Sequence, residues 1–197
     1  MVCALPAELR YFPKRAGVEV IASGVGPIEA ALATAAALAR RPYRAVINAG
    51  IAGVFPGQGE VGDAVLVGSE TIAGLGLEGG GPLALPDGAQ LIDCVEADAA
   101  LMAQCAGSGL RAVRGVTVST ITTTDETAVR LCSLYDAVVE SMEGFAVLRA
   151  GTVAGIPALE VRGISNYVGD RAKSACNFEL GARATAAALG AVLDQLV

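Results

Sequence analysis

Two glutamates occupy positions where a carboxylate could do chemistry. Glu8 follows the first apolar run by three residues, in A-L-P-A-E, and Glu143 lies in S-M-E-G at the end of another apolar run. A carboxylate such as Glu143 can accept two hydrogen bonds from the vicinal diol of a ribose, with Met142 lying against the sugar. The alternative for either glutamate is an acid at a helix start, where the helix dipole favours negative charge.

A third candidate is the segment 162–171, R-G-I-S-N-Y-V-G-D-R. An apolar strand is predicted to end at Arg162, and an arginine buried there needs a carboxylate partner or a bound anion. A polar, glycine-containing loop is predicted to follow. The amide of Asn166 offers one donor group and one acceptor, which match the Hoogsteen edge of a purine.

Two glycine-rich segments follow predicted strands. The first, G-V-G-P at 24–27, favours a tight turn over a dinucleotide site, because Ala30 replaces the third glycine of that pattern. The second, N-A-G-I-A-G at 48–53, is predicted to turn at the C-terminal end of a strand, where open α/β sheets bind ligands. Its backbone N–H groups are candidates to hold a small anion or a sugar hydroxyl, and they belong to Ile51, Ala52 and Gly53.

The absence of histidine from all 197 residues restricts the chemistry further. It excludes Ser–His–Asp triads, Cys–His dyads and H-E-x-x-H zinc sites. A general base must then be a carboxylate or, as weaker alternatives, a Lys, Tyr or Cys. The net charge of −6, without a basic stripe, argues against binding of a nucleic-acid polymer.

Short β-branched runs alternate with longer Ala- and Leu-rich segments along the chain. Strands are predicted at 2–5, 18–22, 45–48, 64–68, 113–119, 137–140 and 158–163, and helices at 27–39, 97–106, 126–133, 144–154 and 178–196. This alternation predicts an α/β sandwich with a central mixed or mostly parallel sheet, and the length predicts one domain over 1–197. The Gly- and Pro-rich segment 73–88 is predicted to be irregular, either a functional lid or disordered.

Composition also bears on the oligomeric state and the cellular location of the protein. The share of hydrophobic residues is 53%, which is high for a monomer, so we expect a homodimer or a higher homo-oligomer. Five cysteines without a C-x-x-C pair are typical of a reduced protein, and no signal peptide is recognised, so we expect a cytoplasmic location. No uncharged apolar run is long enough for a membrane span.

Taken together, five motifs in order resemble the nucleoside phosphorylase and nucleosidase superfamily. They are A-L-P-A-E, S-G-V-G-P, N-A-G-I-A-G followed by V-G-D, S-M-E-G, and R-G-I-S-N-Y-V-G-D-R. The nearest branch holds the methylthioadenosine/S-adenosylhomocysteine nucleosidases and the futalosine hydrolases, and the last two motifs are most similar to the futalosine hydrolases. The resemblance implies a single-domain, three-layer α/β/α sandwich with a central mixed sheet.

The resemblance also implies roles for individual residues. Glu8 corresponds to the carboxylate that activates the attacking water, Arg162 to an arginine of the water pocket, and Glu143 to the ribose-binding acid. Asn166 stands where adenine-specific nucleosidases carry an Asp. Thr123 falls near the expected base pocket, although its threonine-rich segment also suits a strand end and helix cap, and Asp170 is a further substrate-binding candidate.

The amide at Asn166 favours a 6-oxopurine, because Asn can donate to O6 but cannot protonate N7 of adenine. The implied reaction is hydrolysis of the N-glycosidic bond of futalosine, releasing hypoxanthine in menaquinone biosynthesis, without a metal or cofactor. Neither glycine-rich segment carries a basic or hydroxyl side chain for phosphate, so water is the favoured nucleophile. Three alternatives remain, namely an adenine-specific nucleosidase, a purine nucleoside phosphorylase and a non-catalytic nucleoside-binding protein.

Overall fold

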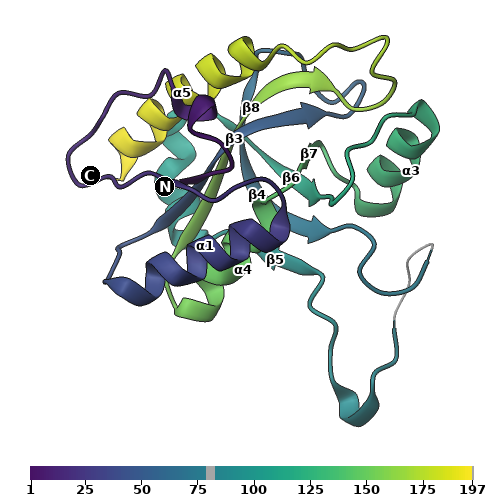
Figure 1. Ribbon diagram of the computed structural model, residues 1–197, viewed down its shortest axis with the longest axis horizontal. Coiled ribbons are helices and arrows are strands. Elements are labelled where there is room, and N and C mark those ends of the chain that lie inside the picture. Colours follow the sequence, from purple (N-terminus) through teal and green to yellow (C-terminus); the bar gives the residue numbers. More distant parts are fainter. Residues whose placement is uncertain (79–82, 197) are drawn as a thin grey trace.

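Eight strands form one mixed sheet in the computed structural model, which describes residues 1–78 and 83–196 (Figure 1). They are β1 (Val2–Cys3), β2 (Ile21–Ala22), β3 (Val46–Val54), β4 (Ala64–Ile72), β5 (Cys94–Glu96), β6 (Arg111–Thr117), β7 (Val139–Ser141) and β8 (Ala158–Tyr167). The strand order is β2-β1-β3-β7-β6-β4-β5, and β8 pairs with both β3 and β4. Pairs such as β3 with β8 are parallel, whereas β4 with β8 is antiparallel, so the predicted mixed sheet is confirmed.

The pairings of five strands close the sheet into a ring. β3 pairs with β8, β8 with β4, β4 with β6, β6 with β7, and β7 again with β3. One buried apolar cluster takes residues from all five strands, namely Ala52, Val54, Val65, Val67, Val113, Val139 and Ile164. The sequence predicts the sheet but not this closure, which brings β4 and β8 side by side.

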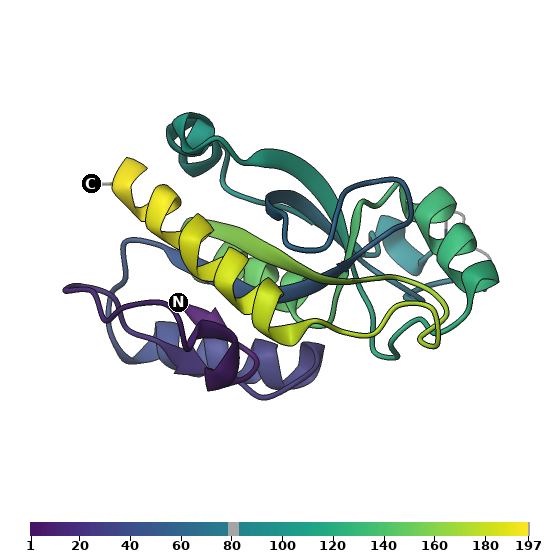
Figure 2. The same cartoon turned by 90° about the horizontal axis from the view of Figure 1, so that it is seen from above.

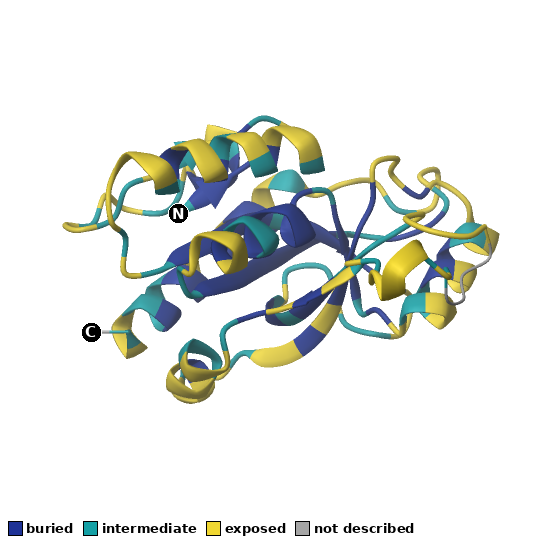
Figure 3. Ribbon diagram, turned by 90° about the horizontal axis from the view of Figure 1, so that it is seen from below, coloured by how far each residue is buried: buried dark blue, intermediate teal, exposed yellow. Residues whose placement is uncertain are grey.

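Helices cover both faces of the sheet. They are α1 (Pro27–Arg40), α2 (Ala99–Gln104), α3 (Asp125–Tyr135), α4 (Gly144–Ala154) and α5 (Phe178–Gln195), with short 3-10 turns η1 (Pro6–Leu9), η2 (Pro86–Gly88) and η3 (Cys105–Ser108). Figures 1 and 2 show α1 beside α4, and α5 lying along β8. Val46 packs with α1 and α4, whereas the next residue, Ile47, packs with α5, so the two helical layers lie on opposite faces. The strands between them are the most buried part of the chain (Figure 3).

Local sequence signals place several helix starts correctly. Pro27 is the first residue of α1, and the turn before it uses positive φ at Gly24 (90°) and Gly26 (98°), so the tight turn is confirmed. Thr124 caps α3 by accepting a hydrogen bond from the Thr127 N–H at 3.3 Å.

Two predicted loops are wrong. Residues 48–53 lie inside β3 rather than in a turn, and β8 runs on to Tyr167 rather than ending near Arg162. Gly50 and Gly53 are extended residues that pair with β8, so their missing side chains serve close approach rather than turning. β5 is a strand that the sequence pattern does not predict.

Residues 73–78, after β4, and residues 83–88 extend away from the sheet (Figure 1). Residues 79–82 lie outside the described part of the chain, so the choice between lid and disorder stays open. The described remainder is irregular apart from η2, and it is tied back to α3 where the Gly74 N–H donates to the Tyr135 hydroxyl at 3.1 Å. Within residues 1–78 and 83–196, none of the helices has the length and apolar character needed to cross a membrane.

Candidate active site

Glu8 is held in place by two backbone hydrogen bonds. It lies in η1, directly after β1, with 4% of its surface exposed. Its Oε2 accepts from the Leu5 N–H at 2.9 Å, and its Oε1 accepts from the Ile51 N–H on β3 at 3.0 Å. Burial raises the pKa of Glu8, while nearby Arg162 and the two N–H donors act in the opposite direction. The result is an oriented carboxyl group with a raised pKa, which suits a general base.

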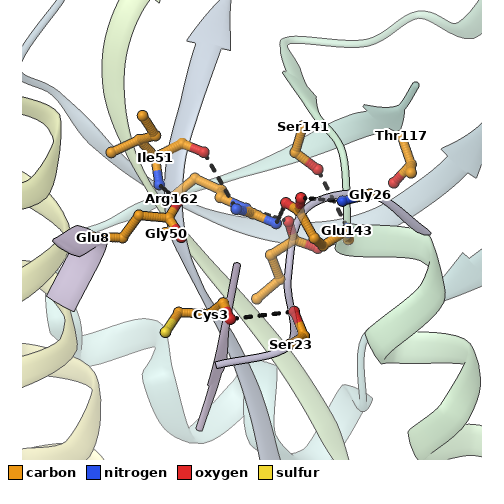
Figure 4. A network of polar contacts seen from close by, with 12 residues as sticks. Cys3, Glu8, Ser23, Gly26, Gly50, Ile51, Thr117, Ser141, Glu143 and Arg162 are labelled. Carbon is orange, nitrogen blue, oxygen red and sulfur yellow. Dashed lines mark hydrogen bonds and ion pairs between the residues drawn. The ribbon is translucent and has the colours of Figure 1, made fainter. Parts of the chain in front are cut away.

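Arg162 is the buried cation of the site, with 1% exposure. Its Nε donates to Glu160 Oε1 at 2.7 Å, Nη1 donates to the Ile51 carbonyl at 3.2 Å, and Nη2 lies 3.6 Å from Glu143 Oε2. The side chain thus reaches from Ile51 to Glu143 (Figure 4). Burial alone would lower the pKa of Arg162, but Glu160, Glu143 and Glu8 raise it above its usual value. Arg162 therefore has the carboxylate partners that its burial requires.

Gly50 makes the approach of Glu8 and Arg162 possible. A methyl group on its Cα would clash with Glu8 Oε1 and would lie 2.9 Å from Arg162 Nη1. Glu8, from η1, and Arg162, from β8, therefore both approach the backbone at Gly50, where no side chain stands in the way.

Glu143 stands at the junction of β7 and α4, as its motif predicts, and is 5% exposed. Its Oε1 accepts from the Gly26 N–H at 3.0 Å, at the start of α1. The backbone N–H that a dinucleotide phosphate would need is therefore occupied by a protein carboxylate. Glu143 Oε2 faces Arg162 and has capacity for further hydrogen bonds.

Asn166 lies opposite Gly53 in the pairing of β8 with β3. Its Nδ2 donates to the Tyr167 carbonyl at 3.0 Å, and its Oδ1 accepts from the Ser165 hydroxyl at 2.8 Å. A methyl group on Gly53 would lie 3.0 Å from Nδ2. The Ala52 carbonyl also accepts from Ser165, at 3.2 Å. The amide is thus oriented, and one Nδ2 hydrogen remains for a ligand.

Three predicted site residues make contacts outside this network. Met142 is half-buried and packs against the apolar cluster beneath α3. Thr123 is exposed and lines a hollow of about 650 Å³ between α3 and the segment that follows β4. Asp170 accepts from the Ala172 N–H, and its own N–H donates to Asp125. The structure brings Glu8, Ile51, Glu143 and Arg162 together and places Asn166 beside Ala52 and Gly53.

Glu160 and Glu70 are buried carboxyl groups next to the site, and sequence reasoning does not predict them. Glu160 precedes Arg162 by two residues on β8, so both side chains share a face, and this spacing in A-L-E-V-R was an available signal. Glu70 lies on β4, where its Oε2 accepts from the Thr117 hydroxyl at 2.7 Å. Only the ring closure places it there, so the sequence offered no comparable signal.

Sequence comparisons place the chain among nucleoside-processing enzymes. Residues 8–197 match the family model described as the Phosphorylase superfamily. The futalosine hydrolase of Thermus thermophilus is 36% identical over 82% of this chain and 74% of its own length, and that of Streptomyces coelicolor is 37% identical over 81% and 71%. The 5'-methylthioadenosine/S-adenosylhomocysteine nucleosidase of Colwellia psychrerythraea is 31% identical over 77% and 68%.

Solved structures agree on the fold. The 5'-methylthioadenosine/S-adenosylhomocysteine nucleosidase of Helicobacter pylori superposes with a TM-score of 0.84 at 18% identity, over 98% of this chain and 96% of the other. The futalosine hydrolase of the same organism gives 0.84 at 18%, with the same coverage. The expected fold class is therefore confirmed, and so is the resemblance drawn from the five motifs. The chain belongs to the phosphorylase superfamily and is a relative of the futalosine hydrolases.

Proposed function

We propose that the protein is a futalosine hydrolase, which cleaves the N-glycosidic bond of futalosine with water and releases hypoxanthine. The observation that carries this proposal is the buried Glu8 carboxyl group, oriented by two backbone N–H donors beside Arg162 and Glu143. The identity to proteins named futalosine hydrolase supports the choice of substrate. On this proposal the protein acts in menaquinone biosynthesis.

In the proposed reaction, Glu143 Oε2 accepts hydrogen bonds from the ribose hydroxyls while Gly26 holds the other carboxylate oxygen. Glu8 takes a proton from a water molecule, whose oxygen forms a bond to the anomeric carbon. The bond from that carbon to the base nitrogen breaks, and its electron pair leaves with the base, which takes up one proton to give neutral hypoxanthine while Glu8 releases the proton that it took from water. The carboxylates stabilise the positive charge that develops on the sugar, and orientation supplies much of the rate enhancement. The steps balance with water as the only co-substrate.

The base end of the site is assigned to Asn166. The free Nδ2 hydrogen can donate to O6 of hypoxanthine as negative charge develops there. We propose that Met142 lies against the sugar, that the backbone at Ile51, Ala52 and Gly53 borders it, and that Thr123 and Asp170 reach the ligand when it binds. An adenine-specific nucleosidase is the second candidate, favoured by the identity to the Colwellia enzyme.

Exposed apolar side chains on α1 support the expected homo-oligomer. Val25, Ile28 and Leu32 are 51%, 72% and 63% exposed, in or just before one helix. We propose that this face lies between subunits of a cytoplasmic dimer or larger assembly.

A substrate panel tests the proposed function. Futalosine, 5'-methylthioadenosine and inosine are incubated with the protein with and without phosphate, and the released base is measured by chromatography. We expect hypoxanthine from futalosine at a rate that does not depend on phosphate. A strict phosphate requirement would indicate a phosphorylase, and release of adenine alone would indicate the second candidate.

In the same panel, Asn166→Asp is expected to raise the ratio of adenine to hypoxanthine release, and an unchanged ratio contradicts the role of the amide.

A further inference from the structure

Four buried carboxyl groups surround a single buried cation. Arg162 contacts Glu160 and Glu143 directly, and Glu8 faces it across Gly50. Glu70, on the neighbouring strand β4, meets Glu160 beside Gly144. Glu70 and Glu160 are completely buried, with 0% exposure. One guanidinium cannot balance four buried negative charges, so some of these groups must carry protons.

The contacts of Glu70 and Glu160 leave one oxygen free on each. Glu160 Oε1 accepts from Arg162 Nε, and Glu70 Oε2 accepts from the Thr117 hydroxyl. The other two oxygens, Glu70 Oε1 and Glu160 Oε2, are buried without a donor in the described part of the chain. They converge beside Gly144, where a methyl group would lie 2.5 Å from Glu160 Oε2 and still closer to Glu70 Oε1. Two converging acceptor oxygens repel unless a donor lies between them, and a proton on one of the two carboxyl groups is the donor that the pair itself can supply.

We propose that Glu70 and Glu160 share one proton, and that the pair is a positioning device that fixes the Arg162 guanidinium between Ile51 and Glu143. This inference rests on the proposed function for its kinetic test and extends it by two residues. Neither glutamate contacts the reacting atoms in the proposed reaction; both act through Arg162.

The hydrogen bonds around Thr117 locate the proton. Thr117 Oγ1 accepts from the Phe145 N–H at 2.8 Å, so its single hydrogen is directed to Glu70 Oε2. Glu70 Oε2 is therefore an acceptor, and the acid proton lies on Oε1, facing Glu160. Glu160 remains the carboxylate that pairs with Arg162, and the pair carries one negative charge against one positive charge.

The electrostatics of the surroundings agree with this assignment. Burial raises the pKa of both carboxyl groups, and the neighbouring Glu160 raises the pKa of Glu70 further. Arg162 on β8 is the cation that faces both groups, and Glu143 at the start of α4 is a second anion near Glu160. Thr117 on β6 is neutral. Loss of the shared proton at high pH would leave two adjacent anions and would displace Arg162, so activity should fall.

The two glutamates are therefore not equivalent to substitution. Glu70→Gln places an amide N–H where the acid proton lies and keeps an oxygen for Thr117, so it mimics the protonated state permanently. Glu160→Gln removes the anion that holds Arg162 Nε. If the pair only stabilised the fold, the two substitutions would lower the activity to the same extent.

The experiment measures kcat and KM against pH for the nucleoside that the wild-type protein hydrolyses. We expect Glu70→Gln to stay within about threefold of wild type near neutral pH and to lose the alkaline fall in kcat, and Glu160→Gln to lower kcat by at least about tenfold with little change in KM. Glu96→Gln, an exposed carboxylate on β5, is the matched control and should keep the wild-type profile. Equal losses in both folded variants, or an alkaline fall that persists in Glu70→Gln, overturn the proposal.

Two further measurements test the proposal if no nucleoside is hydrolysed or if the Glu70→Gln variant does not fold. Infrared difference spectra at neutral pH should show one protonated-carboxyl band lost in Glu70→Gln but not in Glu96→Gln, which tests the proton even if no nucleoside is hydrolysed. An unchanged band shows that Glu70 is ionised and overturns the proposal independently of the proposed function. If Glu70→Gln does not fold, Thr117→Val removes the donor that favours ionised Glu70, so the alkaline fall should move to higher pH; no movement contradicts the shared proton.

Discussion

Glu8 combines a fixed orientation with an environment that raises its affinity for a proton. Each carboxylate oxygen already accepts one backbone N–H, from Leu5 or Ile51, and keeps a second lone pair for water. A base works only when it is ionised, and burial raises the pKa of Glu8 above the usual 4.5. We therefore expect kcat/KM to fall on the acid side with a midpoint above pH 4.5, measured with the preferred nucleoside.

Substitution of the same residue provides the control. Glu8→Gln should lower kcat by about a hundredfold or more, because the amide cannot accept the proton of water. One amide hydrogen will face a backbone N–H, so a small loss of thermal stability is expected, which circular dichroism can follow. A folded Glu8→Gln protein with near-normal turnover would assign the base elsewhere.

At the scale of elements, β3 shows why bare backbone is required in the middle of a strand. Gly50 lies where Glu8 and Arg162 converge, and Gly50→Ala would place a methyl group against both. We expect about 1–3 kcal/mol of destabilisation from overpacking, together with a fall in kcat of about tenfold or more. Gly190→Ala in α5 is the matched control, because its methyl group meets nothing within 4 Å and alanine favours helix. Equal effects of the two substitutions on kcat would contradict the close-approach role.

Part of the site could be predicted from the sequence, whereas the glycines of β3 could not be placed correctly. Glu8, Glu143 and Arg162 stand at changes from apolar to polar sequence, and α4 was predicted with its observed bounds. The turn predicted at 48–53 is wrong because closely spaced glycines are typical of turns, whereas here they allow side chains from other elements to approach the strand. The side chains that approach Gly50, Glu8 and Arg162, lie 42 residues before it and 112 residues after it along the sequence.

The contact between Glu70 and Glu160 could not be predicted from the sequence. It depends on β4 pairing antiparallel with β8 while β8 also pairs with β3. Such closure is a property of strand register across the whole sheet, and local periodicity carries no information about it. The buried acid pair therefore appears only when the fold is known.

At the scale of the whole molecule, the missing histidines make the pH dependence of stability unusually informative. Ordinary proteins titrate histidine between pH 5 and 8, but this chain has none, so perturbed carboxyl groups and the Met1 amino group titrate in that window. Burial lowers the pKa of the Met1 amino group, which opposes the effect of the buried carboxyl groups on stability. Burial raises the pKa values of Glu8, Glu70, Glu140 and Glu160 in the folded protein. The folded state then binds more protons than the unfolded state above about pH 4.5.

The sign of the effect follows from this excess of bound protons. The stabilisation from a raised carboxyl pKa is fully present below the unfolded value and is lost as pH rises through the folded value. The exposed acids Glu19, Asp125 and Glu179 have lowered pKa values, and their contribution is lost only at more acidic pH, below this window. We therefore expect the free energy of unfolding, measured by urea titration, to fall between pH 5 and 8, by up to about 1.4 kcal/mol per pH unit for each extra proton. Glu140→Gln should make the fall shallower by removing one such group, and a free energy that rises across the window would mean that the buried acids are ionised in the folded protein.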